Sequence, residues 1–233
     1  MKAEIRLDEQ IQPRHQLNSL PAGIRAETNN REPSRTQGTL LWIRNKMLFS
    51  KSAKIDIYPP DRQGTGSFDS GKITEIKPID FPGGTSQTQR MGPLFYWAWA
   101  SARGDGVIGL HPHKGFEIIS YVLEGEIGHS DTLGTKSRVS AGGAQVMQTG
   151  SGVSHQEEMI GEKTEFFQIW FEPHLQKAVR RDATYGEYQQ GDFPVANKDG
   201  VEIKKVIGEG APVSLVAEVE MDDITLQPGV THG

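Results

Sequence analysis

The sequence of 233 residues contains no cysteine. Disulfide bonds, thiolate-bound zinc, cysteine-ligated iron–sulfur clusters and thiol nucleophiles are therefore all excluded. No apolar run approaches the roughly 18–20 residues that a membrane-spanning helix needs, so we expect no membrane partner. The first ten residues lack the apolar stretch of a secretory signal, and a cytoplasmic location is the expectation.

An excess of positive charge is missing as well. The chain has 25 Lys and Arg against 30 Asp and Glu, which gives a formal net charge of -5. Such a chain has no general attraction for phosphate groups, so we expect no direct nucleic-acid partner. Turn residues, by contrast, are abundant: 27 glycines and 13 prolines are spread along the chain. Turns at this frequency predict a β-rich fold.

Short apolar segments between the turns predict strands. These segments are 72–79, 93–100, 116–123, 145–148, 165–171, 201–207, 213–219 and 224–226, with two or three more strands within 39–58. The Gly- and Ser-rich segment 61–70 and the segment 81–92 predict loops, and 173–188 is the best helix candidate. Short strands at this spacing are typical of an antiparallel sandwich or barrel.

Two short clusters of residues with metal-binding side chains stand out. His111 and His113 are separated by one residue, and His155 and Glu157 repeat that spacing. Because residues two apart in an extended strand point to the same face, all four side chains converge if the two segments lie side by side. Imidazole and carboxylate without thiolate suit iron, nickel, copper, manganese or zinc. A histidine pair alone is more often structural or solvated, but here four such residues occur in two matching pairs.

The residues around these clusters resemble the pirin family, a branch of the cupin superfamily. The resemblance rests on His111-Pro112-His113-Lys114-Gly115-Phe116-Glu117, Tyr121-Val122-Leu123-Glu124-Gly125, His129-x-Asp131-x-x-Gly134, the turn Thr149-Gly150-x-Gly152 before His155-x-Glu157, and Gln168-Ile169-Trp170. It covers about residues 93–172 and extends more weakly to about 227. The order and spacing of these pieces make the resemblance far more specific than a lone His-x-His.

The resemblance implies an all-β fold of the cupin type, an antiparallel jelly-roll barrel with a metal in its mouth. Pirins contain two such barrels, so we expect a bicupin-like chain. Residues 1–80 would form an N-terminal extension with possible strands, 81–172 the metal-binding barrel, and 173–233 a linker helix and the start of a second β-barrel. The metal motif lies farther from the start than is usual in the family, and the sequence stops at Gly233. We therefore expect an incomplete or rearranged second barrel, to which 39–79 could contribute strands.

The resemblance also implies a ligand set for one divalent metal: His111, His113, His155 and Glu157. Iron, as Fe²⁺, is the metal usually described for the family, and nickel, copper, manganese, zinc and cobalt are compatible alternatives. The wider cupin pattern of His-x-His followed after three or four residues by Glu would make Glu117 the fourth ligand instead. The pirin resemblance favours Glu157.

Other histidines and the aromatic residues receive less specific roles. His129 is expected on a polar strand surface and His174 at a helix start or on the surface. The aromatic run Phe95, Tyr96, Trp97 and Trp99 is expected mainly in the core, with one or two rings at a pocket mouth. Further candidate pocket walls are Phe116, Met147 and Gln145.

Members of the pirin family are similar to quercetin 2,3-dioxygenases. The resemblance thus implies an enzyme that cleaves flavonol-like, quercetin-type substrates with O₂ and releases carbon monoxide. The expected partners are a small aromatic molecule and O₂, with Glu157 as the general base that accepts the enol proton. The alternative is a non-enzymatic, iron-containing, redox-responsive regulator that binds a protein partner. A sugar-binding or isomerase cupin is a third hypothesis for the function.

Overall fold

The computed structural model describes residues 2–6 and 57–231. The chain divides into two compact units, Met1–Glu9 with Tyr58–Gly233 and, separately, Gln10–Ile57. All of the second unit except Ile57 lies outside the described residues, as do the strands expected between 39 and 56. Within the described ranges, no helix is long and apolar enough to cross a membrane.

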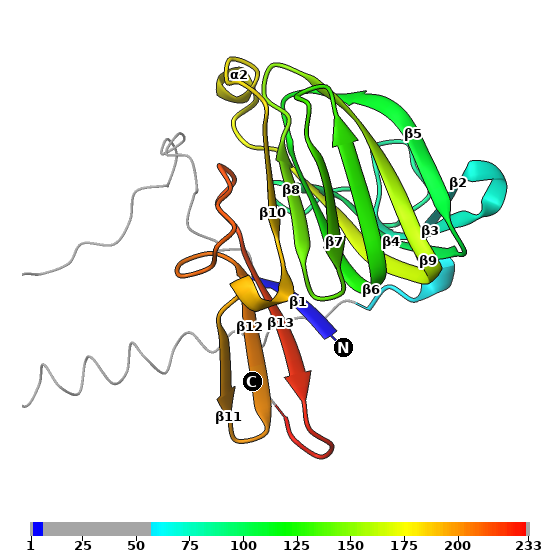
Figure 1. Ribbon diagram of the computed structural model, residues 1–233. Coiled ribbons are helices and arrows are strands. Elements are labelled where there is room, and N and C mark those ends of the chain that lie inside the picture. Colours follow the sequence, from blue (N-terminus) through cyan, green and yellow to red (C-terminus); the bar gives the residue numbers. More distant parts are fainter. Residues whose placement is uncertain (1, 7–56, 232–233) are drawn as a thin grey trace, which may run out of the picture. The chain divides into compact units, whose positions relative to one another are not determined.

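The first unit contains two sheets (Figure 1). The nine-stranded sheet comprises β2 (Gly64–Phe68), β3 (Ile73–Ile79), β4 (Leu94–Arg103), β5 (Gly106–His113), β6 (Glu117–Asp131), β7 (Lys136–Ser140), β8 (Ala144–Gln148), β9 (Val153–Phe171) and β10 (Thr184–Tyr188). The four-stranded sheet has the order β1 (Lys2–Arg6), β13 (Glu220–Leu226), β12 (Val201–Ile207) and β11 (Val195–Lys198). The helical elements are α2 (Leu175–Ala178) and the 3₁₀ turns η1 (Pro60–Arg62), η2 (Asp69–Gly71) and η3 (Gln190–Asp192). The all-β prediction is confirmed.

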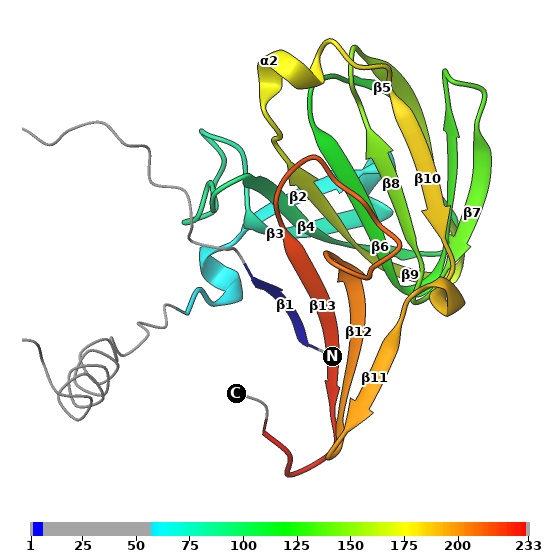
Figure 2. The ribbon, with the colours of Figure 1, turned by 90° about the vertical axis from the view of Figure 1, so that its left-hand side faces the viewer.

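The barrel is formed by two long, bent strands. The first half of β6 pairs with β8 and its second half with β7, whereas β9 pairs with β5 through its first half and with β4 through its second. β6 and β9 pair with each other along their length, with register shifts between Val122 and Glu126. Gly125 lies at this bend with φ 77°, and a Cβ there would approach Lys163 O to 2.3 Å. The bend therefore requires glycine, and it lets the sheet curl around an interior (Figure 2).

The barrel interior is layered. One end is filled by an apolar cluster, Ile73, Ala100, Ala102, Val122, Ile127, Val139, Met159 and Phe166. Farther along the same inward faces lie buried polar side chains, including Glu75, Ser120, Glu157 and Gln168. The opposite end receives the end of β5 and the start of β9. The interior thus becomes polar towards the end that carries the histidines.

Part of the outer face of the nine-stranded sheet is also buried. Its Ile119, Tyr121 and Phe171 belong to one core cluster with Ile207 and Met221 of the four-stranded sheet. Full burial of each apolar side chain of this size contributes about 1.5–3 kcal/mol. The two sheets therefore share a hydrophobic core.

The helix expected over 173–188 is wrong for most of its length. Only Leu175–Ala178 is helical, and Thr184–Tyr188 forms β10, which pairs antiparallel with β8. The sequence Thr-Tyr-Gly-Glu-Tyr combines a β-branched residue and aromatics with a helix-weakening glycine, a composition suited to an edge strand. Its pairing partner, not its local charge, decides the conformation.

Three further expectations are corrected. The strand expected at 213–219 is a loop in which only Val213 forms an isolated bridge; its amides at 216 and 217 bond to the carboxylate of Glu117. The loop expected at 61–70 contains β2, an edge strand whose Gly66 permits the close approach of Glu75. Strands β2 and β3 join the nine-stranded sheet, so 64–79 adds nothing to the second sheet, whereas β1 does.

Candidate metal centre

Three neighbouring strands build the candidate site. His111 of β5 lies opposite His155 of β9, and on the other side of β9 Asp131 of β6 lies opposite His155. Two residues away on each of these strands, His129 of β6 lies opposite Glu157 of β9. Each strand contributes two side chains spaced two residues apart, so the pleat places them on the same inward face. The predicted convergence of the two histidine clusters is what the register produces.

His111, His113 and His155 lie together. Their potential ligand atoms are all within 4.8 Å of one another, and the three ring centroids are 4.4–4.9 Å apart. His111 Nδ1 lies 2.7 Å from the carbonyl oxygen of Gly109. Because a carbonyl only accepts, Nδ1 carries the hydrogen and the lone pair of His111 is on Nε2.

Of the other two histidines, His155 is buried and His113 is half-buried. His155 is 2% exposed, and neither of its ring nitrogens has a hydrogen-bond partner among the described residues; His113 Nε2 is also without one. Burial, and after it the charge repulsion expected from the neighbouring imidazoles, lowers the pKa of both side chains to about 3. Buried nitrogens without partners are rare in proteins. Neutral imidazoles with free lone pairs are the form that binds a divalent metal, so the residues fit such an ion.

Glu157 lies on the same inward face, but its carboxylate is already held. Gln168 Nε2 donates to both oxygens at 2.8 Å, and Ser120 Oγ donates to Oε1 at 3.1 Å. The negative charge of Glu157 favours the protonated form of His113 and so opposes the lowering of the pKa of that histidine. The structure thus brings three of the four predicted ligands into one cluster and places the fourth beside them, fixed by two donors.

Glu117 is on the other face of β6. Its carboxylate accepts hydrogen bonds from Val216 N at 2.7 Å, Ala217 N at 2.9 Å and Gln148 Nε2 at 2.7 Å. All these donors lie outside the histidine cluster. The side chain therefore anchors the 208–219 loop to the outside of the barrel.

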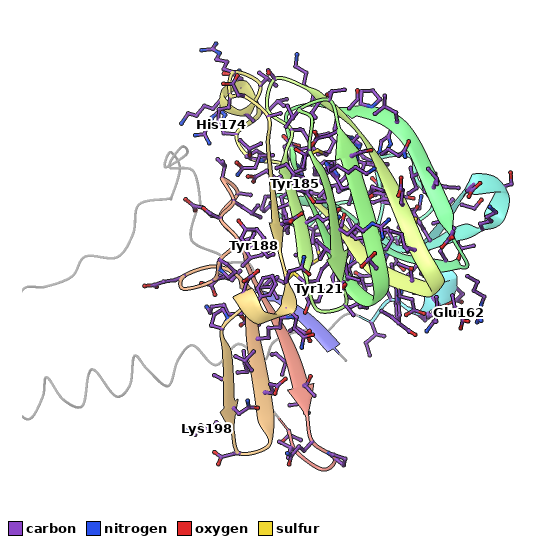
Figure 3. All side chains as sticks on the ribbon, in the orientation of Figure 1. Tyr121, Glu162, His174, Tyr185, Tyr188 and Lys198 are labelled. Carbon is purple, nitrogen blue, oxygen red and sulfur yellow. The ribbon has the colours of Figure 1, made fainter. Side chains whose placement is uncertain are left out.

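His129 was expected on a polar surface, and this is wrong. It is 4% exposed, its Nε2 lies 2.8 Å from Asp131 Oδ2, and its ring is 5.4 Å from that of His155. Tyr185 of β10, labelled in Figure 3, stacks on the His129 ring at 4.1 Å and hydrogen-bonds Ser137. The sequence reasoning missed Asp131 and Tyr185 at this site. The available signal was the His129-x-Asp131 spacing, which repeats that of the other clusters.

Aromatic rings line the approach to the histidines. Trp170 stacks on Phe116, with ring centroids 4.9 Å apart, and its centroid lies 4.5 Å from that of Tyr96. Phe116 in turn meets the ring of His113 edge-on, at a centroid distance of 5.3 Å. Of the expected core aromatics, Tyr96 is buried but Trp99 is 43% exposed. A pocket of about 510 Å³ opens beside His113; it is lined by Pro112, His113, Lys114, Phe116, Thr132, Gly152, Val153 and Ser154. The buried Met147 and Gln145 are not among these residues.

His174 is at the start of α2, as expected (Figure 3). A Cβ on Gly115 would lie 2.6 Å from Leu175 Cδ1, so α2 covers the turn that follows β5. The helix therefore lies at the histidine end of the barrel.

Comparisons with known proteins agree with this architecture. Residues 94–171 match the sequence profile of the family described as Pirin. Pirin-like protein 2 of Arabidopsis thaliana is 37% identical over 123 residues, which cover 51% of this chain and 38% of that protein. The quercetin 2,3-dioxygenase of Escherichia coli K12 is 45% identical over 67 residues, 28% of this chain and 29% of the relative. The alignments thus span less than half the length of these relatives.

Solved structures show the same fold. GK1651 from Geobacillus kaustophilus superposes with a TM-score of 0.62 at 24% identity, covering 72% of this chain and 68% of the other. The bacterial pirin YhhW from Escherichia coli, solved in complex with nickel(II), has a TM-score of 0.51 at 23% identity and covers 63% and 68%. At these identities the likeness concerns the fold.

Proposed function

We propose that this chain, which carries a pirin-type cupin domain over residues 94–171, is a metal-dependent dioxygenase that cleaves flavonol-like aromatic enols with O₂. The observation that carries the proposal is the cluster of three histidines with unpartnered nitrogens at the polar end of the barrel. Relatives named quercetin 2,3-dioxygenase support the reaction class. We propose His111, His113, His155 and Glu157 as the ligands. Fe²⁺ is the first choice of metal, and nickel(II) is supported by the pirin solved with that ion.

The chemistry that a divalent metal supplies at such a site is Lewis-acid polarisation of the enol oxygen. Glu157 accepts the enol proton as general base. When its carboxylate takes up this proton, it gives up part of the hydrogen bonding that it accepts from Gln168 and Ser120. Gln168 and Ser120 hold that carboxylate at a fixed position before the proton arrives. Catalysis gains from such preorganised donors because they need no rearrangement during the reaction.

The aromatic residues position the substrate. The stacked pair of Phe116 and Trp170 offers a flat apolar wall next to His113. A planar ring against this wall directs one oxygen towards the histidines and excludes water from that side. The apolar cluster that fills the other end of the barrel keeps bulk water from reaching the site through the interior.

Metal analysis combined with a flavonol assay tests the proposal. About one iron, nickel or copper per chain is expected, with oxygen-dependent loss of the quercetin absorbance when an anaerobic mixture is exposed to air. His111→Ala and His155→Ala should each abolish turnover while the far-ultraviolet circular dichroism stays that of a β protein. The surface variant His174→Ala is the matched control and should turn over like the parent.

The contrary outcomes are distinct. Near parental turnover in either cluster variant would disprove the ligand assignment. Metal binding without turnover would favour the non-enzymatic regulator, whose partner would then be sought with the oxidised and the reduced protein. Full function after metal removal would favour a sugar-binding or isomerase cupin.

A further inference from the structure

We propose that the substrate of the metal centre carries a second, anionic group, and that Lys114 at the pocket mouth binds it. The inference rests on the proposed function and deepens it. The ligand class is a planar aromatic enol with a carboxylate or another acidic group on the side away from the histidines.

The turn after β5 places Lys114 at the pocket. His113 ends the strand with its ring in the cluster, and the next two residues leave the strand's alternation. Gly115 has φ 88°, a conformation that glycine tolerates and other residues rarely adopt. The turn is packed beneath α2, because a Cβ on Gly115 would collide with Leu175. Lys114 lines the same pocket as His113.

The pocket suits one planar ligand. Its volume of about 510 Å³ lies within the roughly 300–1,000 Å³ typical of small-molecule sites. Phe116 forms an apolar wall that is stacked on Trp170 and so is held in place. His113, at the pocket's inner side, belongs to the metal cluster. An aromatic ligand in this pocket can reach the centre with one end only.

The other end meets an uncompensated positive charge. Among the described residues that line the pocket, Lys114 is the only lysine, arginine or carboxylate, whereas His113 belongs to the histidine cluster. Lys114 is exposed and forms no ion pair with a described residue. The carboxylate of Asp131, one residue before the lining residue Thr132, is buried and committed to His129 and to the amides of Leu133 and Thr135. The remaining polar rim groups, Thr132 and Ser154, are uncharged. Charge complementarity thus selects an anion.

Binding of two matched ligands tests the inference. The nickel(II)-loaded protein is titrated under argon, which prevents turnover, with 3-hydroxyflavone and with 3-hydroxyflavone-4′-carboxylate, and tryptophan fluorescence reports binding. The parent protein should bind the carboxylate about three- to fivefold more tightly, the upper part of the range for an ion pair near solvent. Lys114→Gln should remove this preference and Lys114→Glu should reverse it, while the affinity for 3-hydroxyflavone changes by less than about twofold.

A distant lysine and ionic strength provide the controls. Lys198, labelled in Figure 3 in β11 of the four-stranded sheet, is also exposed, and Lys198→Gln should keep the preference. The preference should fall as salt is added, since screening weakens exposed ion pairs. Binding of 3-hydroxyflavone without any preference in the parent, or a preference that survives Lys114→Gln, would overturn the role of Lys114 and leave the proposed function standing. If neither ligand binds, both this inference and the flavonol assignment fail.

Discussion

At the scale of the residue, His113 and His155 determine how the candidate metal site responds to acid. The pKa values of His113 and His155 are lowered to about 3, first by burial and then by neighbouring histidines, which are His155 and His111 for His113, and His111 and His129 for His155. They stay neutral throughout the range in which an exposed histidine gains its proton. This keeps both lone pairs available, but it also makes the folded state sensitive to acid.

The metal-free protein should therefore lose stability as the pH falls from about 6.5 towards about 3. The unfolded chain binds a proton on each histidine below its ordinary pKa of about 6.5, and the folded chain does not, so acid favours unfolding. The slope of the free energy of unfolding approaches roughly 1.4 kcal/mol per pH unit for each group. Denaturant titrations at a series of pH values measure it.

The controls separate these histidines from other titrating groups. His155→Asn should lower the slope of the free energy of unfolding against pH by up to roughly 1.4 kcal/mol per pH unit, the contribution of one titrating group. His174→Asn, at the exposed start of α2, should leave the slope unchanged. The contribution of Glu75 is present in all three proteins and cancels in the comparison, because neither histidine is among the causes of its pKa shift. An unchanged slope in His155→Asn would mean that His155 is protonated in the folded state.

The sequence predicted which histidines meet but not how His129 is oriented. The first set could be inferred because two identical His-x-ligand spacings imply one shared face. For β6, both faces are buried along much of the strand, with the barrel interior on one side and the four-stranded sheet on the other. The polar–apolar alternation that would reveal its inward face is therefore lost. The position of Glu117 was open for the same reason.

At the scale of the element, strands with their own pattern were predictable and strands defined by a partner were not. β3, β4 and β12 were found close to their observed limits because alternation or an apolar run lies between turn residues. β10 was predicted as a helix because its conformation depends on pairing with β8. The 213–219 segment has strand-like composition, but its amides find a carboxylate instead of a neighbouring strand.

Glu117→Ala should release the 208–219 loop without affecting metal binding. The change removes the acceptor of two backbone amides, at Val216 and Ala217, and leaving buried donors unpaired costs about 1–3 kcal/mol each. Hydrogen exchange at these two amides should accelerate, and the free energy of unfolding should fall. The exposed Glu218 of the same loop offers the control, since Glu218→Ala removes no hydrogen bond seen among the described residues. Loss of metal with unchanged exchange would instead identify Glu117 as the fourth ligand of the wider cupin pattern.

At the scale of the whole described unit, the barrel that carries the histidine cluster and the four-stranded sheet are joined by both apolar and polar contacts. Tyr121 of β6, labelled in Figure 3, donates to Asp223 Oδ2 at 2.6 Å and accepts from Lys204 Nζ at 3.1 Å. Lys204 also donates to the carbonyl oxygen of Gly142. Around this polar contact lies the core cluster that includes Ile207 and Met221. Two sheets joined in this way are expected to unfold together.

Metal binding at one end of the barrel should therefore stabilise the second sheet as well. An ion that binds only the folded state adds about 2.7 kcal/mol at a free concentration of 100 times its dissociation constant. Nickel(II) should raise the unfolding midpoint seen by fluorescence of Trp97, Trp99 and Trp170, which all lie in the nine-stranded sheet. It should also slow hydrogen exchange in β12 and β13, by the factor that corresponds to the same gain in the free energy of unfolding.

Two variants make this coupling falsifiable. His155→Ala should abolish both effects of the ion, because the histidine cluster loses a member. Met221→Ala, in the shared core at 1% exposure, should cost about 2–5 kcal/mol and lower the midpoint reported by the barrel tryptophans, although no tryptophan lies in its strand. Were nickel(II) to protect the barrel strands while exchange in β12 and β13 stayed unchanged, the two sheets would be separate folding units. The four-stranded sheet would then have to be stable without the barrel, and Met221→Ala would leave the tryptophan transition where it was.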